Sequence, residues 1–301
     1  MDYVLQTYDL TKNFRNKPAV NKVNMNVKKG EIYGFIGKNG AGKTTLIRMV
    51  AGLAKPTEGS IKLFNSNNLD EQRVKTGTLI ENPAIYPNLT AKQNLYYYCR
   101  LLGIDPSATI DSTLALVGLS DTGKKKAKNF SLGMKQRLAI AIALLGDPEF
   151  LMLDEPINGL DPSGIREVRE LVLRLNKERN ITILISSHIL GELSKIATCY
   201  GIINNGILVD EFSKEELEER CSRELQIKVS DVDKAVDILE NNLGIMDYKV
   251  SDDSTIHISQ NLELAGTINT ELAKNSVIVF SSSIVGTDLE DYFMGLMEQS
   301  N

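Results

Sequence analysis

The chain has 301 residues, 42% apolar and 24% charged, a composition typical of a globular protein with about two domains. No run of about 18 apolar residues occurs, so the sequence predicts no membrane-spanning helix. The net charge is −5, yet residues 220–301 hold six basic and fourteen acidic side chains, which leaves the remainder at +3. Because phosphate contacts need surplus lysine and arginine, an acidic C-terminal segment argues against nucleic acid as a partner.

The first part of the chain alternates short apolar strands with helical segments. Strands are expected at 4–10, 20–27, 31–37, 150–153 and 181–185, and helices at 44–53, 92–102, 110–117, 132–145 and 165–177. This rhythm predicts an α/β fold on a largely parallel sheet, with residues 82–147 forming an inserted helical subdomain. Asn205-Gly206 between two apolar runs predicts a tight hairpin.

The second part begins beyond a helix expected at 215–221, where Ser213 to Glu216 has capping-box spacing. Strands are then expected at 225–229, 245–250, 255–258 and 277–281, and helices at 233–242, 262–273 and 289–298. This order predicts a ferredoxin-like α+β domain with one added helix. The expected domains are therefore 1–221 and 222–301. The second has no catalytic set, and His257 has no evident partner, so we interpret it as a dimerisation or regulatory module.

A glycine-rich loop after the strand at 31–37 carries the pattern G-x-x-x-x-G-K-[ST]. Glycines let consecutive backbone N–H groups face one phosphate cluster, and a following helix N-terminus favours negative charge. Lys43 is expected at the β- and γ-phosphates, and the Thr44 hydroxyl at Mg²⁺. The predicted nucleotide-binding loop is Gly37, Lys38, Asn39, Gly40, Ala41, Gly42, Lys43, Thr44 and Thr45.

Two acids, Asp154 and Glu155, follow the apolar strand at 150–153. The carboxyl end of a strand in an open α/β sheet lies near the phosphate loop. Asp154 is expected to hold Mg²⁺ directly or through water, and Glu155 to act as general base or to orient the attacking water. A polar strand end without function is the alternative, which the phosphate loop upstream disfavours.

Three further motifs resemble those of the ATP-binding subunits of ABC transporters. Residues 129–138, NFSLGMKQRL, resemble the signature region; residues 156–162, PINGLDP, resemble the D-loop; and Ser186-Ser187-His188 resembles the switch-histidine loop. The resemblance covers about residues 3–220. It implies a P-loop ABC nucleotide-binding domain that hydrolyses ATP, with ATP and Mg²⁺ as cofactors.

The resemblance also implies a homodimer that forms head to tail on ATP binding. The phosphate loop of one subunit would then face the signature of the other, where Ser131 and the backbone of Gly133 would bind the γ-phosphate. Asp161 would couple the two sites, and His188 would contact the γ-phosphate. Phe14 would stack on adenine, although a lone aromatic there could equally belong to the core. The implied catalytic residues are Lys43, Glu155 and His188.

Two departures from the family pattern occur. The signature has Leu132 and Met134 where glycine and glutamine are usual, and Glu81 stands where the family has glutamine. A carboxylate can still bind Mg²⁺ or water, but it adds negative charge beside the phosphates. The implied metal ligands are Thr44, Glu81 and Asp154.

Residues 76–95, TGTLIENPAIYPNLTAKQNL, and 289–296, LEDYFMGL, resemble the bacitracin-resistance and lantibiotic-immunity branch. Its members pair with separately encoded membrane permeases and export antimicrobial peptides, which implies a peripheral position on the cytoplasmic face of a bacterial membrane. Residues 83–102 would receive the permease, and Tyr96-Tyr97-Tyr98 would either line that groove or pack in the core. The alternatives are an exporter of small drugs or sodium, a soluble ABC ATPase acting on ribosomes or DNA, and a regulatory P-loop protein with vestigial hydrolysis.

Overall fold

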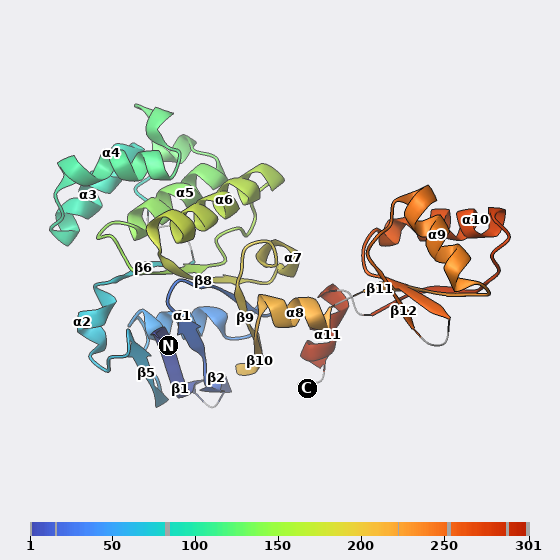
Figure 1. The fold of residues 1–301 in the computed structure, drawn as a ribbon. Coiled ribbons are helices and arrows are strands. Elements are labelled where there is room, and N and C mark those ends of the chain that lie inside the picture. Colours follow the sequence, from blue (N-terminus) through green and yellow to red (C-terminus); the bar gives the residue numbers. More distant parts are fainter. Residues whose placement is uncertain are drawn as a thin grey trace. The chain divides into compact units, whose positions relative to one another are not determined.

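The computed structural model describes residues 2–15, 17–81, 85–221, 223–251, 254–286 and 289–298 (Figure 1). The chain divides into two compact units, residues 1–214 and 215–299. Within the described ranges no helix is both long enough and apolar enough to span a bilayer. Pro83, where the expected permease-binding surface starts, lies outside the described residues.

The first unit is built around a six-stranded sheet in the order β10-β9-β4-β8-β7-β6. Its strands are β4 (Ile32–Ile36), β6 (Thr76–Leu79), β7 (Phe150–Asp154), β8 (Thr182–Ser187), β9 (Cys199–Asn204) and β10 (Ile207–Ser213). All neighbours are parallel except β9 and β10, which form the hairpin predicted at Asn205-Gly206. Every residue of β4, β7 and β8 is buried, as expected for central parallel strands.

A second sheet in this unit pairs β1 (Tyr3–Phe14) with β2 (Lys17–Val23), β3 (Asn26–Lys28) and β5 (Glu58–Leu63). The prediction of one strand at 20–27 is wrong, because the chain breaks there into β2 and β3. Buried Thr7 stabilises the break: its hydroxyl donates to the carbonyl of Val23 and accepts from the N–H of Met25, both at 2.9 Å. Backbone groups that leave the ladder are thereby satisfied.

Helices complete the first unit: α1 (Lys43–Val50), α2 (Leu69–Arg73), α3 (Ala91–Leu102), α4 (Pro106–Leu116), α5 (Leu132–Ala143), α6 (Pro162–Arg179) and α7 (Leu190–Leu193). Helices α3 to α5 lie between β6 and β7 in sequence, within the range expected for the helical subdomain (Figure 1). A capping box between Thr90 and Gln93 begins α3. Tyr96 and Tyr97 on α3 are 53% and 44% exposed, so core packing is wrong for these two rings.

Helix α1 is fixed by apolar packing. Leu46, Ile47, Met49 and Val50 are fully buried in one core cluster with residues of both sheets. Complete burial of such side chains is worth about 1.5–3 kcal/mol each. The loop that leads into α1 is therefore held at the carboxyl end of β4.

The second unit begins within α8 (Lys214–Arg220), at Glu215. Its other elements are β11 (Glu224–Val229), α9 (Val232–Leu243), β12 (Tyr248–Ser251), β13 (Thr255–Ile258), α10 (Ala265–Lys274), β14 (Val279–Val285) and α11 (Leu289–Glu298). Its antiparallel sheet has the order β12-β13-β11-β14. Apolar residues of α9 and α10 form one core with residues of β11 and β13. The strand predicted at 245–250 starts only at Tyr248, because Ile245 is buried in the core as part of the preceding loop.

His257 on β13 does have partners, contrary to the expectation from sequence. Its Nδ1 lies 2.8 Å from Oε1 of Glu224 on β11, and its Nε2 lies 3.2 Å from Oγ of Ser251 on β12. Hydrogen bonds from Gln226 and then from His257 lower the pKa of Glu224. These partners come from strands that are adjacent only after the sheet has formed.

Candidate active site

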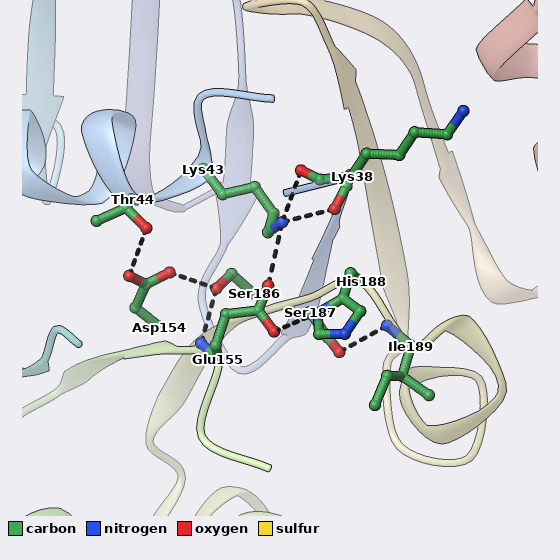
Figure 2. Close-up of polar contacts among 10 residues, drawn as sticks. Lys38, Lys43, Thr44, Asp154, Glu155, Ser186, Ser187, His188 and Ile189 are labelled. Atoms are coloured by element: carbon green, nitrogen blue, oxygen red, sulfur yellow. Dashed lines mark hydrogen bonds and ion pairs between the residues drawn. The ribbon is translucent and has the colours of Figure 1, made fainter. Parts of the chain in front are cut away.

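Five of the predicted functional residues meet where β4, β7 and β8 end: Lys43, Thr44, Asp154, Glu155 and His188. These strands are parallel neighbours, with Ile36 opposite Ser187 and Asp154 opposite Ser186. Their carboxyl ends therefore lie at one edge of the sheet, with the glycine-rich loop after β4 beside the acids after β7 (Figure 2). The strand register alone brings together residues that are more than 100 positions apart.

The glycine-rich loop packs too closely for side chains at two positions. A Cβ on Gly37 would lie 2.5 Å from the carbonyl oxygen of Ile203, and one on Gly42 would lie 2.4 Å from that of Ala19. Gly42 also has φ +112°, a conformation that favours glycine. A Cβ on Gly40 would meet nothing within 4 Å, so the loop is open to a ligand there.

Lys43 is only 5% exposed, at the first position of α1. Its Nζ donates to the carbonyls of Gly37 at 2.5 Å and Lys38 at 3.2 Å, and lies 3.1 Å from Oε1 of Glu155 (Figure 2). The last contact is an ion pair without hydrogen-bond alignment, since Oε1 has no hydrogen bond in the described chain. A cavity of about 170 Å³ adjoins the amine, lined by Ala19, Asn39, Gly40, Ala41, Gly42, Lys43, Thr44, Thr45 and Glu155.

Asp154 is 2% exposed, and both its carboxylate oxygens accept hydrogen bonds from hydroxyl groups. Thr44 Oγ1 donates to Oδ2 at 2.7 Å, and Ser186 Oγ donates to Oδ1 at 2.6 Å. Ser186 also accepts from the N–H of Glu155 at 2.9 Å, so one hydroxyl fixes both acids. The sequence assigned Ser186 no role of its own; its position as a polar residue ending a buried strand beside β7 was the available signal.

Glu155 joins Lys43 to His188. Its Oε2 lies 2.8 Å from Nδ1 of His188, while Oε1 faces the lysine (Figure 2). Its backbone has φ +49°, which costs about 1–3 kcal/mol for a residue other than glycine and is concentrated at functional sites. A carboxylate held at the cavity between a cation and an imidazole can accept a proton from water.

The site has the chemistry that a nucleoside triphosphate requires. Gly42 caps α1 without a side-chain hydrogen bond, so the first backbone N–H groups of the helix remain available for an anion. The buried ammonium of Lys43 supplies positive charge beside the open Gly40. The oxygens of Thr44 and Asp154 are the donors that Mg²⁺ prefers. The residues present therefore fit both groups.

Ser131 and Asp161 occupy a separate surface and cap their own helices. Ser131 Oγ accepts from Met134 N at the start of α5, and Asp161 Oδ1 accepts from Gly164 N at the start of α6, both at 3.2 Å. Both are exposed, whereas Gly133 is buried beside Gly164. In the described structure, the hydrogen bonds of the two caps stay within their own helices.

Two further predicted residues, Glu81 and Phe14, have other partners. Glu81 Oε1 accepts a hydrogen bond from Arg48 Nη2 at 2.7 Å, so the unusual carboxylate is paired with a cation of α1. Phe14, at the end of β1, is 53% exposed, with Lys12 Nζ 5.3 Å from its ring centre. The core alternative for Phe14 is therefore wrong.

Comparison with known proteins shows which family the chain resembles. Residues 20–158 match the family profile described as ABC transporter. The bacitracin transport ATP-binding protein BcrA of Bacillus licheniformis is 45% identical over 99% of this chain and 98% of its own. The lantibiotic transport ATP-binding protein SrtF of Streptococcus pyogenes is 43% identical over 74% of this chain and 97% of its own.

The fold is also shared with a solved ATP-binding cassette, a dimer in a post-hydrolysis state with ADP and Pi. Its TM-score is 0.63 at 24% identity, over 70% of this chain and 98% of that one. Together with the phosphate loop and the two acids, the full-length similarity to BcrA establishes that this chain belongs to the ATP-binding subunits of ABC transporters.

Proposed function

We propose that the chain powers a separately encoded membrane permease that exports antimicrobial peptides of the bacitracin or lantibiotic class. The observation that carries the hydrolytic function is Glu155, fixed between Lys43 and His188 at the end of β7. The substrate class rests on relatives that transport bacitracin and a lantibiotic and that align over most or all of this chain. An exporter of another drug or of sodium is the alternative.

The residues divide the chemistry of hydrolysis among them. Lys43 exchanges its contacts with backbone carbonyls and Glu155 for the β- and γ-phosphates, which leaves Glu155 free to accept a proton from the attacking water. His188, which is bonded to Glu155, is proposed to contact the γ-phosphate. Thr44 and Asp154 would hold Mg²⁺, which neutralises charge that develops on the phosphates. Glu81, which is paired with Arg48, would have to be released from it to join Thr44 and Asp154 as a ligand.

The second half of each site comes from a second subunit in this proposal. Ser131, Gly133 and Asp161 lie at helix starts, where backbone N–H groups favour an anion. The dimeric relative with ADP and Pi supports a nucleotide-dependent dimer. We infer a head-to-tail arrangement, in which this surface meets the phosphate loop of the other subunit.

An aromatic surface on the helical insertion is proposed to receive the permease. Tyr86 and Tyr97 pack edge to face with ring centres 4.6 Å apart, and both are at least 40% exposed. Exposed aromatic clusters are typical of interfaces. Docking there would place the chain on the cytoplasmic face of the membrane.

For the C-terminal part, we propose a ferredoxin-like accessory domain, with the boundary near residue 221. The order β12-β13-β11-β14 and the two helices α9 and α10 support this assignment. Dimerisation or regulation is its proposed role.

ATP turnover by the purified chain tests the hydrolytic proposal. Glu155→Gln keeps the side-chain shape but removes the base, so turnover should fall by about 10²–10⁴-fold. Gel filtration in Mg-ATP should then show a trapped dimer. Glu149→Gln is the control, because Glu149 is exposed just before β7 and pairs with Lys29. Turnover that survives Glu155→Gln would remove Glu155 as the base.

Growth of the source bacterium tests the substrate class. Deletion of the gene should sensitise cells to bacitracin or a lantibiotic but not to an antibiotic that acts inside the cell. Wild-type protein should restore resistance, and Glu155→Gln should not. Sensitisation to the intracellular drug alone would favour the alternative exporter.

A further inference from the structure

The edge strands of the three sheets differ in how they are protected from pairing with another chain. Unprotected edges present unpaired backbone groups, and proteins usually blunt them with short length, charge, proline or bulges. Edges β6 and β12 have four residues each, and β3 has three. Edge β2 contains Pro18 and two lysines, β5 contains a glutamate and a lysine, and β10 contains Asp210 and Glu211.

Strand β14 stands out among these described edges. It has seven residues, VFSSSIV, with neither charge nor proline, and β11 is its sole neighbour in the described sheet. Phe280 is 63% exposed and Ile284 is 42% exposed. A register shift lies at Phe280, where Ser281 pairs with Lys228 and Val279 pairs with Val229, so the shift affects one end of the strand only.

The sequence of β14 is chemically symmetric about Ser282. Two serines flank Ser282, a large apolar residue follows on each side, and a valine ends each arm. In an antiparallel pair of identical strands centred on Ser282, Ser281 faces Ser283 and Phe280 faces Ile284 of the other copy, whereas Val279, beyond the register shift, packs on the domain core. Aromatic–aliphatic and serine–serine pairs are favourable across strands. A twofold interface requires this kind of self-complementarity.

A hydrogen bond to α10 fixes which face of β14 points to the domain core. Ser282 Oγ accepts a hydrogen bond from Asn269 Nδ2 of α10 at 3.0 Å, so this side chain faces the domain core. Alternation along the strand then turns Ser281 and Ser283 to the other face, where both are exposed. Residues on the two sides of Ser282 are thus displayed in a defined register.

We propose that β14 pairs with β14 of a second copy of this chain, joining two four-stranded sheets into one of eight strands. This deepens the proposed dimerisation role of the C-terminal domain and needs no nucleotide. A single strand pair buries less than the ~1,200 Å² of a standard stable interface, so the association is weak in the isolated protein. Two copies bound to one permease would meet at high effective concentration.

Sedimentation velocity of the full chain without nucleotide, over a concentration series, tests the pairing. Wild-type protein should show a concentration-dependent dimer. Phe280→Glu and Ile284→Lys should each raise the dissociation constant about tenfold or more, since each substitution enters the twofold interface twice. The double variant Phe280→Glu/Ile284→Lys should recover dimer, because opposite charges then face each other across the two strands.

Matched controls separate this edge from the rest of the molecule. Val250→Glu alters an equally exposed apolar residue on the opposite edge strand, β12, and should leave the dimer unchanged. Retained ATP turnover in each variant shows that the nucleotide domain is intact. Failure of the pairing therefore leaves the proposed ATPase function standing, and loss of turnover leaves the pairing standing.

Cysteine cross-linking tests the register independently of charge. Under mild oxidation, a mixture of Ser281→Cys and Ser283→Cys chains should give a covalent dimer well above either chain alone. The wild type reports the background from its three native cysteines. A monomer at all concentrations, or cross-linking no stronger in the mixture than in the separate chains, would overturn the proposal.

Discussion

The two surfaces that carry the nucleotide motifs differ in how their side chains are satisfied. At the phosphate loop, Lys43, Glu155 and His188 form a chain of contacts from three separate strand ends. At the signature, Ser131 and Asp161 bind only backbone N–H groups of their own helices in the described structure. The first surface is a preorganised cluster with internal charge compensation, whereas the second is a pair of exposed helix starts.

This difference indicates which half of the reaction one chain can perform. A buried cation beside an open glycine loop offers charge and backbone N–H groups to phosphates within one chain. Helix starts without a ligand of their own gain a function only when an anion is brought to them. One chain should thus bind ATP by itself and hydrolyse it only with a second chain.

Among the changes that test this comparison, removal of the buried cation Lys43 should have the largest effect. Lys43→Ala should weaken ATP binding about tenfold to a hundredfold, because a charge-assisted hydrogen bond contributes about 1.5–3 kcal/mol. Fluorescent-nucleotide titration measures this. Lys38→Ala is the control, since the Lys38 side chain points away from the cluster (Figure 2). Equal losses in both variants would mean that general loop charge, not Lys43, binds the phosphates.

Alteration of the signature should separate binding from turnover. Ser131→Arg should leave ATP affinity near the wild-type value but lower turnover about tenfold or more, through the loss of one anion-binding group in the dimer. Loss of the helix cap should cost about 0.5–2 kcal/mol of stability, which thermal unfolding will report. Ser112→Arg is the control, because Ser112 is exposed on α4. Weakened ATP affinity in the Ser131 variant would contradict the separation of the two surfaces.

The Arg48–Glu81 pair should have a smaller effect. Glu81→Gln removes a negative charge near the phosphates and restores the residue usual in the family, so turnover should rise severalfold, but saturation should need more Mg²⁺ because an anionic ligand is lost. A Mg²⁺ titration at fixed ATP measures both changes. Arg48→Gln, which frees the carboxylate instead, should shift the Mg²⁺ requirement in the opposite direction. A shift of the same sign in both variants would show that the ion pair itself matters.

The titration of Glu211 should give the smallest effect. Burial raises the pKa of Glu211, although its carboxylate accepts hydrogen bonds from Tyr33 at 2.6 Å and Asn26 N at 3.0 Å. The folded state then binds this proton more tightly than the unfolded state, whose glutamate pKa is about 4.3. Stability should therefore fall as pH rises from about 4.3 through the raised pKa, by about 1.4 kcal/mol per unit of pKa difference.

Denaturant unfolding between pH 4 and 8 checks this sign. Glu211→Gln keeps an oxygen acceptor and should remove that decline, whereas Glu58→Gln, exposed on β5, should not. An unchanged pH profile in the Glu211 variant would mean that other groups dominate the titration.

Local patterns in the sequence predicted most of the fold. Apolar runs located the central strands, and turn residues located the hairpin at Asn205-Gly206. The family resemblance and the α/β assignment are confirmed by the similarity to BcrA and by the shared cassette fold. The break between β2 and β3 was missed, because the Thr7 hydroxyl that stabilises it is 16 to 18 residues distant.

The candidate site shows the same difference between residues that the sequence indicates and contacts that form only between distant parts of the chain. Motif spacing indicated Lys43, the end of an apolar strand indicated Asp154 and Glu155, and the family resemblance indicated His188. Strand register explains why they meet. No local pattern indicates that Ser186 joins the two acids or that Arg48 binds Glu81, since these contacts span about 30 residues. The partners of His257 likewise depend on strand order in the finished sheet.

Mixing two inactive variants tests most directly that each site is completed by a second chain. Lys43→Ala lacks a working phosphate loop and Ser131→Arg lacks a working signature, so each should hydrolyse ATP poorly alone. Their mixed head-to-tail dimer keeps one intact loop opposite one intact signature. The account predicts that an equimolar mixture regains roughly a quarter of wild-type turnover, because half the dimers are mixed and hold one good site of two. Turnover no greater than the sum of the separate variants would contradict it.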